Sequence, residues 1–84
     1  MKDHVSIEAI VINSLKALVE SEGLKVEITR TSIMADDLGV DSTELVFILL
    51  EIEKQTAQAL KDIDYGRIST VGDLIDAAQE AAGV

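Results

Sequence analysis

The stretch Ala35-Asp36-Asp37-Leu38-Gly39-Val40-Asp41-Ser42-Thr43-Glu44 joins a polar loop to the start of a helix. Asp41 is suited to cap that helix, because its side-chain oxygen can accept the free backbone N–H groups of the first turn. Glu44 follows three residues later, as the acidic member of a capping box does. The next residues contain neither Gly nor Pro, so a helix is predicted over residues 42–59. We therefore expect Ser42 on the surface at a helix N-terminus, where the N–H groups and the helix dipole favour a phosphate.

The helix predicted over residues 42–59 has two apolar faces. A core-facing stripe is formed by residues that step by three and four, namely Leu45, Ile48, Leu49, Ile52 and Thr56. Val46, Phe47 and Leu50 lie off that stripe, on the flank nearest Ser42. A surface helix of a small domain needs only one apolar face, so the second face is either buried by another helix or left for a partner. Periodicity alone leaves both interpretations open.

Two further helices are predicted from the same periodicity. The first runs from residue 3 or 4 to residue 22 and is ended by Gly23. The last begins with Thr70 as N-cap and Asp73 as its acidic third residue, and it is ended by Gly83. The expected core stripes are Ile7, Ile10, Val11, Ser14, Leu15, Leu18 and Glu22 in the first helix and Val71, Leu74, Ile75 and Ala78 in the last.

Two connections separate the predicted helices. Residues 24–40 are predicted to be a long loop, because one short alternating stretch without a partner strand cannot form a stable sheet. The side chains expected to pin this loop are Val26, Ile28, Ile33, Met34 and Leu38. Residues 60–67 form the second connection, with a short helical turn near residues 63–65. Four helical segments without a convincing strand predict an all-α fold, a small antiparallel bundle of three main helices plus one short helix.

The composition indicates a single acidic domain that spans residues 1–84. Sixteen acidic against seven basic residues give a net charge of −9, which disfavours nucleic acid and anionic membranes. Such a surface suits basic protein partners, or it serves solubility alone. The chain has no Cys and therefore no thiol of its own. The start of the chain lacks a signal-peptide pattern, and the longest apolar run, residues 45–50, is too short to cross a membrane. We expect a monomeric, cytoplasmic protein without membrane insertion.

Candidate catalytic and metal-binding residues are scarce in the sequence. The one histidine, His4, lies in the first predicted turn and is expected to be solvated, so Ser42 lacks a base for nucleophilic catalysis. Asp36, Asp37 and Asp41 do not have the spacing of an EF-hand loop, and we expect no metal site. The sequence therefore predicts a protein that is not an enzyme.

Residues 37–42, Asp-Leu-Gly-Val-Asp-Ser, resemble the attachment site of acyl carrier proteins, whose pattern is Asp-Leu-Gly-x-Asp-Ser. Residues 67–74, Arg-Ile-Ser-Thr-Val-Gly-Asp-Leu, are similar to the piece that opens the last helix in that family, and the resemblance extends over nearly the whole chain. It implies that a phosphopantetheinyl transferase attaches a 4′-phosphopantetheine arm to Ser42. The thiol of this arm would then carry acyl groups as thioesters, with Asp41 and Thr43 beside the root of the arm.

The resemblance also implies partners and a docking surface. Acyl-loading, synthase and transferase enzymes would use basic surfaces to dock on Glu44, Val46, Phe47 and Leu50. Phe47 stands where fatty-acid carriers commonly have an acidic residue, and Thr43 stands where Leu is common. These departures favour a carrier for a specialised fatty acid or polyketide-type pathway.

Two other functions are compatible with the sequence at this point. A free-standing aminoacyl or peptidyl carrier can share the motif around Ser42. A small acidic helical adaptor belongs to a different class of protein, since it would bind a partner helix through its second apolar face. The adaptor predicts no dependence on Ser42, so attachment of phosphopantetheine to this residue discriminates between the classes.

Overall fold

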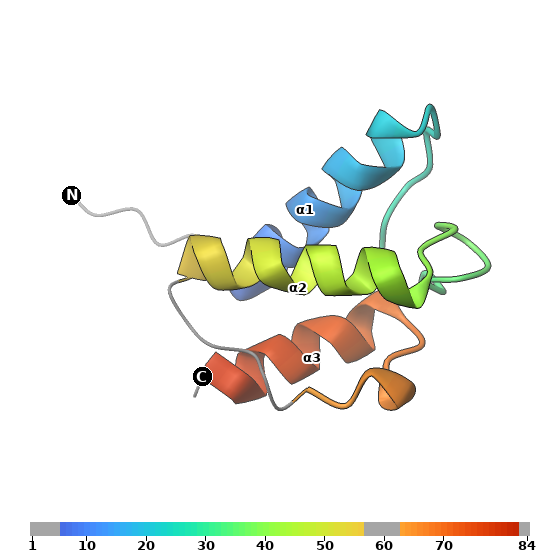
Figure 1. Ribbon diagram of the computed structural model, residues 1–84. Coiled ribbons are helices and arrows are strands. Elements are labelled where there is room, and N and C mark those ends of the chain that lie inside the picture. Colours follow the sequence, from blue (N-terminus) through green and yellow to red (C-terminus); the bar gives the residue numbers. More distant parts are fainter. Residues whose placement is uncertain (1–5, 57–62, 83–84) are drawn as a thin grey trace.

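Three α-helices and one 3-10 helix form the fold: α1 (Ile7–Ser21), α2 (Ser42–Thr56), η1 (Tyr65–Arg67) and α3 (Val71–Ala82) (Figure 1). The computed structural model describes residues 6–56 and 63–82. α1 packs against both α2 and α3 and runs in the direction opposite to theirs. Within the described ranges the β structure is one isolated antiparallel bridge, between Ile33 and Thr70. The predicted all-α bundle of three main helices and one short helix is confirmed.

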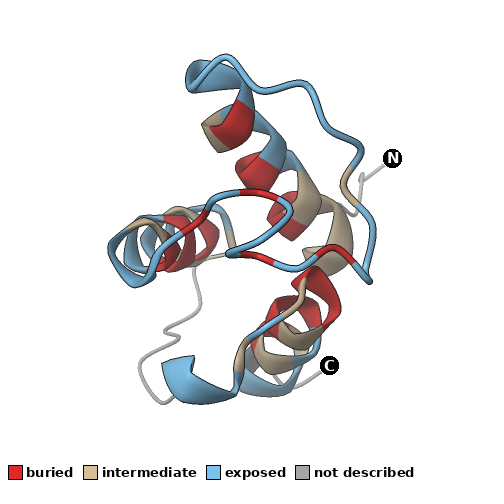
Figure 2. Cartoon of the chain, turned by 90° about the vertical axis from the view of Figure 1, so that its right-hand side faces the viewer, coloured by how far each residue is buried: buried red, intermediate tan, exposed pale blue. Residues whose placement is uncertain are grey.

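The inner faces of the three α-helices enclose the hydrophobic core (Figure 2). Spacing by three and four residues predicted these faces because it brings side chains to one side of a helix. The buried predicted positions are Ile10, Val11, Ser14 and Leu15 in α1, Leu45, Ile48, Leu49 and Ile52 in α2, and Val71, Leu74, Ile75 and Ala78 in α3. Ile7, Leu18 and Thr56 are only half-buried. No helix in the described part of the chain has both the length and the apolarity needed to cross a membrane.

The start of α1 differs from the prediction. Ser6 is the N-cap, with extended backbone (φ −67°, ψ 153°), and its Oγ accepts a hydrogen bond from the Ala9 N–H at 3.0 Å. A helix that begins at residue 3 or 4 cannot run through an extended Ser6, so the predicted start is wrong. Residues 1–5, which include His4, lie outside the described part. The same holds for residues 57–62 and 83–84, where the predicted end of the second helix and Gly83 fall.

α1 ends in a Schellman motif. Its last helical residue is Ser21, one residue before the predicted last residue, Glu22. Gly23 has φ +82°, a left-handed conformation that glycine adopts without steric cost. The N–H groups of Gly23 and Leu24 donate to the carbonyl oxygens of Glu20 and Val19, both at 3.0 Å, which satisfies the last free carbonyls of the helix. Because the chain has left the helix at Glu22, that side chain is exposed. Val19, which the prediction omitted, holds the last buried position of α1.

The loop of residues 24–40 is held partly by apolar side chains and partly by its backbone. Met34 and Leu38 are buried as predicted, and Ile28 packs partly against the core. Val26 and Ile33 are each 40% exposed, so the prediction that they pin the loop is wrong. Backbone hydrogen bonds to the start of α3 fasten the loop instead: Met34 N–H to Ser69 O (2.9 Å), Val71 N–H to Ser32 O (2.9 Å) and Gly72 N–H to Arg30 O (2.8 Å).

The second connection contains η1 and leads into α3. η1 begins two residues later than the predicted turn, and the carboxylate of Asp64 accepts the Gly66 N–H at 3.1 Å to start it. α3 opens with the predicted capping box. The Asp73 N–H donates to Thr70 Oγ1, and the Thr70 N–H donates to Asp73 Oδ2, both at 3.1 Å. Two reciprocal hydrogen bonds therefore hold the start of α3 beside the long loop.

Candidate functional site

Ser42 is the first residue of α2 and is exposed. A reciprocal pair of hydrogen bonds holds the chain around it. The Glu44 N–H donates to Asp41 Oδ1 at 2.8 Å, and the Asp41 N–H donates to Glu44 Oε1 at 3.1 Å. The predicted capping box is thus confirmed, and the first helical bond follows from the Leu45 N–H to the Asp41 carbonyl at 2.9 Å. Ser42 and the exposed Thr43 lie in the first helical turn, whose N–H groups have no carbonyl partner within the helix.

The loop of residues 33–41, called the Ser42 loop below, folds back on itself before the helix. Asp37 accepts the Ile33 N–H through Oδ2 at 2.7 Å, and its own N–H donates to the Ile33 carbonyl at 2.8 Å. Leu38 anchors the turn in the core, and Gly39 has φ +68°, which favours glycine. Each residue of the Asp37-Leu38-Gly39 sequence therefore has a structural role in presenting Ser42.

A pocket of about 260 Å³ opens beside Ser42, between the Ser42 loop, the start of α2 and the η1 segment. Its lining is mostly apolar, with hydroxyl and carboxylate groups at several points. The lining residues are Ile33, Met34, Ala35, Asp36, Val40, Asp41, Ser42, Leu45, Tyr65, Ile68 and Ser69. A ligand attached to Ser42 would therefore find an apolar surface directly beside it.

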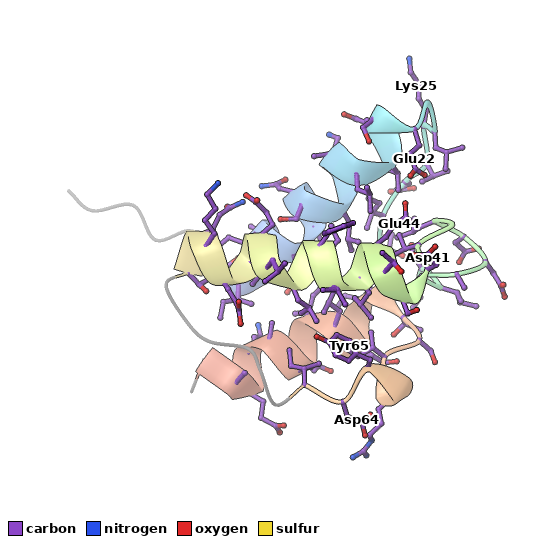
Figure 3. The ribbon with its side chains drawn as sticks, viewed as in Figure 1. Glu22, Lys25, Asp41, Glu44, Asp64 and Tyr65 are labelled. Atoms are coloured by element: carbon purple, nitrogen blue, oxygen red, sulfur yellow. The ribbon has the colours of Figure 1, made fainter. Side chains whose placement is uncertain are left out.

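Tyr65, in η1, lines this pocket together with Ser42 and Leu45 of α2 (Figure 3). Sequence reasoning did not identify Tyr65, Ile68 or Ser69 as site residues. Their proximity to Ser42 arises from the hydrogen bond between Met34 and Ser69, which joins segments far apart in the chain and follows the local turn at η1. No local sequence signal places residues 65–69 beside residue 42.

Three carboxylates gather at the end of the bundle where α2 begins: Glu22, Asp41 and Glu44 (Figure 3). When protonated, Glu22 can donate a hydrogen bond to the Glu44 carboxylate, and this is the largest cause that raises the pKa of Glu22 above its ordinary value. The negative charges of Glu44 and Asp41 and slight desolvation act in the same direction. Ser42 is therefore flanked by a concentrated negative charge that the sequence analysis, which assigned Glu22 to the core stripe, did not anticipate. Within the described residues no group of three or more His, Cys, Asp or Glu side chains is placed to hold a metal ion.

The second apolar face of α2 is not covered by the described residues. Phe47 is 61% exposed, Leu50 is 54% exposed and Val46 is 38% exposed. Of the two interpretations that periodicity left open, burial by another helix is thus excluded for the described part of the fold. Glu44 lies at the start of the same helix and is half-exposed.

Curated proteins similar to this chain are acyl carrier proteins. The acyl carrier protein of Thermotoga maritima is 32% identical over 76 residues, which cover 87% of this chain and 93% of that protein. An acyl carrier protein of Rickettsia bellii is 36% identical over 67 residues, which cover 79% of this chain and 78% of that protein. The acyl carrier protein of an Exiguobacterium species is 33% identical over 69 residues, which cover 81% of this chain and 87% of that protein. No protein-family profile matches the chain, and no solved structure matches it.

The all-α bundle, the exposed serine at the start of α2 and these relatives define the class of protein. The chain belongs to the acyl carrier protein family. Members of this family are carrier proteins and not enzymes, in agreement with the sequence prediction.

Proposed function

We propose that this protein carries acyl groups as thioesters on a 4′-phosphopantetheine arm attached to Ser42. The observation that carries the proposal is the placement of Ser42, which the Asp41–Glu44 capping box exposes at the N-terminus of α2 beside an apolar pocket. In the attachment step the Ser42 hydroxyl attacks the β-phosphate of coenzyme A. A new P–O bond forms to Oγ, the bond to the adenosine 3′,5′-bisphosphate half breaks, and the hydroxyl proton passes to a base of the transferase.

The residues around Ser42 fit such a group. The first-turn N–H groups and the positive end of the α2 dipole favour the phosphate of the arm, and the exposed Thr43 lies at its root. Asp41 holds the helix start in place, and its charge is available to orient the transferase. When bound, the arm supplies the thiol that this chain lacks, since the sequence contains no Cys. The chain's own residues present the hydroxyl, hold the helix start and offer the apolar pocket.

The partners in this proposal are a phosphopantetheinyl transferase and the acyl-loading, synthase and transferase enzymes of a cytoplasmic pathway. The docking surface consists of Glu44, Val46, Phe47 and Leu50, whose apolar members are exposed next to the attachment point. The aromatic side chain of Phe47 supports a specialised fatty acid or polyketide-type pathway. The carrier acts as a monomeric single domain.

Intact-mass measurement tests the attachment. After incubation with coenzyme A and a broad-range phosphopantetheinyl transferase, the wild-type chain should gain one phosphopantetheine. Ser42→Ala should gain none while its helical circular-dichroism signal stays intact. Ser69→Ala is the matched control, because Ser69 lines the same pocket and its loss should leave the addition unchanged. Modification of the Ser42→Ala variant would refute the assignment.

A further inference from the structure

An exposed stretch of the long loop has a backbone open to a second strand. Residues 24–28, Leu-Lys-Val-Glu-Ile, follow the end of α1 and contain no helix, turn or bend. Among the described residues no backbone hydrogen bond involves the N–H or C=O groups of residues 25–28. The ribbon that leaves α1 runs on the outside of the bundle and is pale blue for most of its length (Figure 2). We call residues 24–28 the open segment.

Both ends of the open segment are fixed to the fold. The Leu24 N–H donates to the Val19 carbonyl at 3.0 Å, and the Thr29 N–H, one residue past the segment, donates to Ser32 Oγ at 3.0 Å. Ile28 packs partly against the core. The described structure therefore holds this backbone in place and leaves its donors and acceptors open, as they are at the edge of a sheet.

The side chains of the open segment are complementary to themselves. Leu24, Val26 and Ile28 alternate with two charged residues, which is the two-residue period of a strand. When two such segments lie antiparallel with Val26 opposite Val26, Lys25 of each copy lies opposite Glu27 of the other. The same register places Leu24 opposite Ile28. Opposite charges and apolar pairs that face each other across strands are stabilising, whereas like charges are destabilising.

The two charges of the open segment also select the direction of pairing. Lys25 and Glu27 are exposed, and neither forms an ion pair among the described residues. Proteins usually protect an exposed edge with charge, lysine above all. A parallel pair in register would place lysine opposite lysine and glutamate opposite glutamate, which is unfavourable. The antiparallel register centred on Val26 instead turns both charges into attractive contacts.

We propose that two copies of the chain associate through their open segments as antiparallel strands around a two-fold axis at Val26. The axis makes the contact isologous, so each copy offers the same surface and the assembly closes as a dimer. A strand of another protein could add to the same edge, but nothing in the segment specifies its sequence, whereas a second copy matches the segment at each position. The stretch that cannot form a sheet alone gains a partner strand in this way.

The association is weak. Two short strands are marginally stable in water, and the net charge of −9 on each copy opposes contact. We expect a Kd of about 1 mM at about 0.15 M NaCl, where repulsion beyond about 8 Å is screened. The chain therefore remains the monomer of the proposed function in dilute solution. The pairing goes beyond that function, because the open segment does not include Ser42.

Cysteine trapping tests the register, since the chain has no thiol of its own. Directly opposite residues of antiparallel strands have Cα atoms about 4.5–5.5 Å apart, within the range that a disulfide spans. The full-length chain without the arm is incubated at about 0.5 mM, near the expected Kd, with oxidised glutathione as the oxidant. Intact mass should show about fivefold more disulfide-linked dimer for Val26→Cys than for Leu24→Cys.

Leu24→Cys is the matched control for the trapping. Leu24 and Val26 are 39% and 40% exposed, so their thiols are equally open to random collision. In the proposed register the two Leu24 positions lie four residues apart along the paired strands, about 13 Å, which is too far for a disulfide. Circular dichroism of both variants checks that the helices are intact.

Charge exchange tests the contact between Lys25 and Glu27 in the Val26→Cys background. Lys25→Glu alone and Glu27→Lys alone should each reduce the covalent dimer about fivefold, because like charges then face each other. An equimolar mixture of the two should restore it as a heterodimer of distinct mass, because each facing pair is then of opposite charge. Glu27→Lys also makes the chain less acidic, so a contact governed by net charge alone would give more dimer and not less.

Three results would overturn the proposal. Equal trapping of Val26→Cys and Leu24→Cys would show random collision. A Val26→Cys chain that stays monomeric would show that the segments do not pair, and a Glu27→Lys variant that dimerises as much as its parent would exclude the facing charges. Because these measurements use the chain without the arm, their failure leaves the proposed attachment to Ser42 untouched.

Discussion

The backbone N–H of Met34 donates to the carbonyl oxygen of Ser69 at 2.9 Å, and this bond joins the Ser42 loop to the segment before α3. On one side, the carbonyl of Met34 accepts the Val40 N–H at 2.8 Å, two residues before Ser42. On the other side, the N–H of Ser69 donates to Asp73 Oδ2 at 3.0 Å. A continuous run of hydrogen bonds thus connects the first turn of α3 with the chain that presents Ser42.

The first prediction concerns Asp73. Hydrogen bonds from the backbone N–H groups of Ser69 and Thr70 hold the pKa of Asp73 below its ordinary value of 3.8. A lowered pKa in the folded state means that the ionised group contributes stability at pH values above 3.8, and that this contribution is lost as the pH falls through the folded-state pKa. Asp73→Asn should therefore lower the denaturant midpoint at neutral pH, and the difference from wild type should narrow in acid.

Glu80→Gln is the matched control for this measurement. Glu80 is an exposed carboxylate on the same helix, away from its N-terminus. Its loss should not lower the midpoint, since it removes one negative charge without breaking a cap. Equal midpoints for Asp73→Asn and Glu80→Gln at neutral pH would show that the Asp73 carboxylate contributes nothing beyond its charge.

Features that depend on neighbours along the chain could be predicted from the sequence. Both capping boxes, Asp41–Glu44 and Thr70–Asp73, join residues three apart, so the residue types alone define the geometry. The buried stripes of α2 and α3 follow from helical periodicity for the same reason. The family motif added the role of Ser42, which periodicity does not supply.

Features that depend on tertiary contact could not be predicted. The start of α1 is a separate, local case: Ser6 caps the helix through the Ala9 N–H three residues later, and the periodicity of apolar residues does not reveal this cap. Val26 and Ile33 were expected to pin the long loop, but backbone bonds to residues 69–72 hold it and leave both side chains exposed. The place of Tyr65 in the pocket beside Ser42 and the meeting of Glu22 with Glu44 likewise join segments far apart in the chain.

The second prediction concerns Glu22. The hydrogen bond that protonated Glu22 can donate to Glu44, together with the nearby negative charges, raises the pKa of Glu22 above 4.5. A carboxyl group whose pKa is higher in the folded state stabilises the fold fully when the pH is below its pKa in the unfolded chain. This stabilisation is lost as the pH rises through its pKa in the folded state. The ionised carboxylate is thus unfavourable near neutrality, and Glu22→Gln should raise the melting temperature at pH 7 but not below pH 4.5. Glu20→Gln, in the last turn of α1 two residues before Glu22, should raise the melting temperature less. A larger gain for Glu20→Gln would argue that only the net charge matters.

The third prediction concerns the buried hydroxyl of Ser14. Its side chain lies in the core with 8% exposure, and its Oγ has no hydrogen-bond partner among the described residues. A buried hydroxyl without a partner costs about 1–3 kcal/mol, and Ala is also the better helix former. Ser14→Ala should therefore stabilise the fold by about 1 kcal/mol in denaturant titration. Ser21→Ala provides the contrast, because Ser21 Oγ donates to the Leu18 carbonyl at 2.6 Å and its removal should give no gain. A loss of stability in Ser14→Ala would show that the hydroxyl is bonded in solution.

The fourth prediction concerns Gly72, where α3 meets the long loop. A Cβ added at this position would lie 3.0 Å from the Arg30 carbonyl oxygen, which itself accepts the Gly72 N–H at 2.8 Å. Replacing Gly by Ala in a helix gains up to about 1 kcal/mol, but forcing an extra carbon into a packed site costs about 1–3 kcal/mol. We expect the steric cost to be the larger, so Gly72→Ala should lower the free energy of unfolding by about 1 kcal/mol. Faster hydrogen exchange of the Gly72 and Val71 amides should accompany it, and a stabilised variant with unchanged exchange would contradict this account.

The last prediction separates the two apolar faces of α2 by their energies. Leu49 is 3% exposed and packs in the core, so Leu49→Ala should destabilise the fold by about 2–5 kcal/mol through lost transfer energy and a cavity. Phe47 is 61% exposed, and truncation of a surface side chain usually changes stability by less than about 0.5 kcal/mol. The same type of substitution two residues away in one helix should thus differ by several kcal/mol, which urea titration resolves readily. If Phe47→Ala lowers the unfolding midpoint as much as Leu49→Ala does, the ring is buried in solution. A docking surface would then have to be sought among Glu44, Glu51 and Glu53.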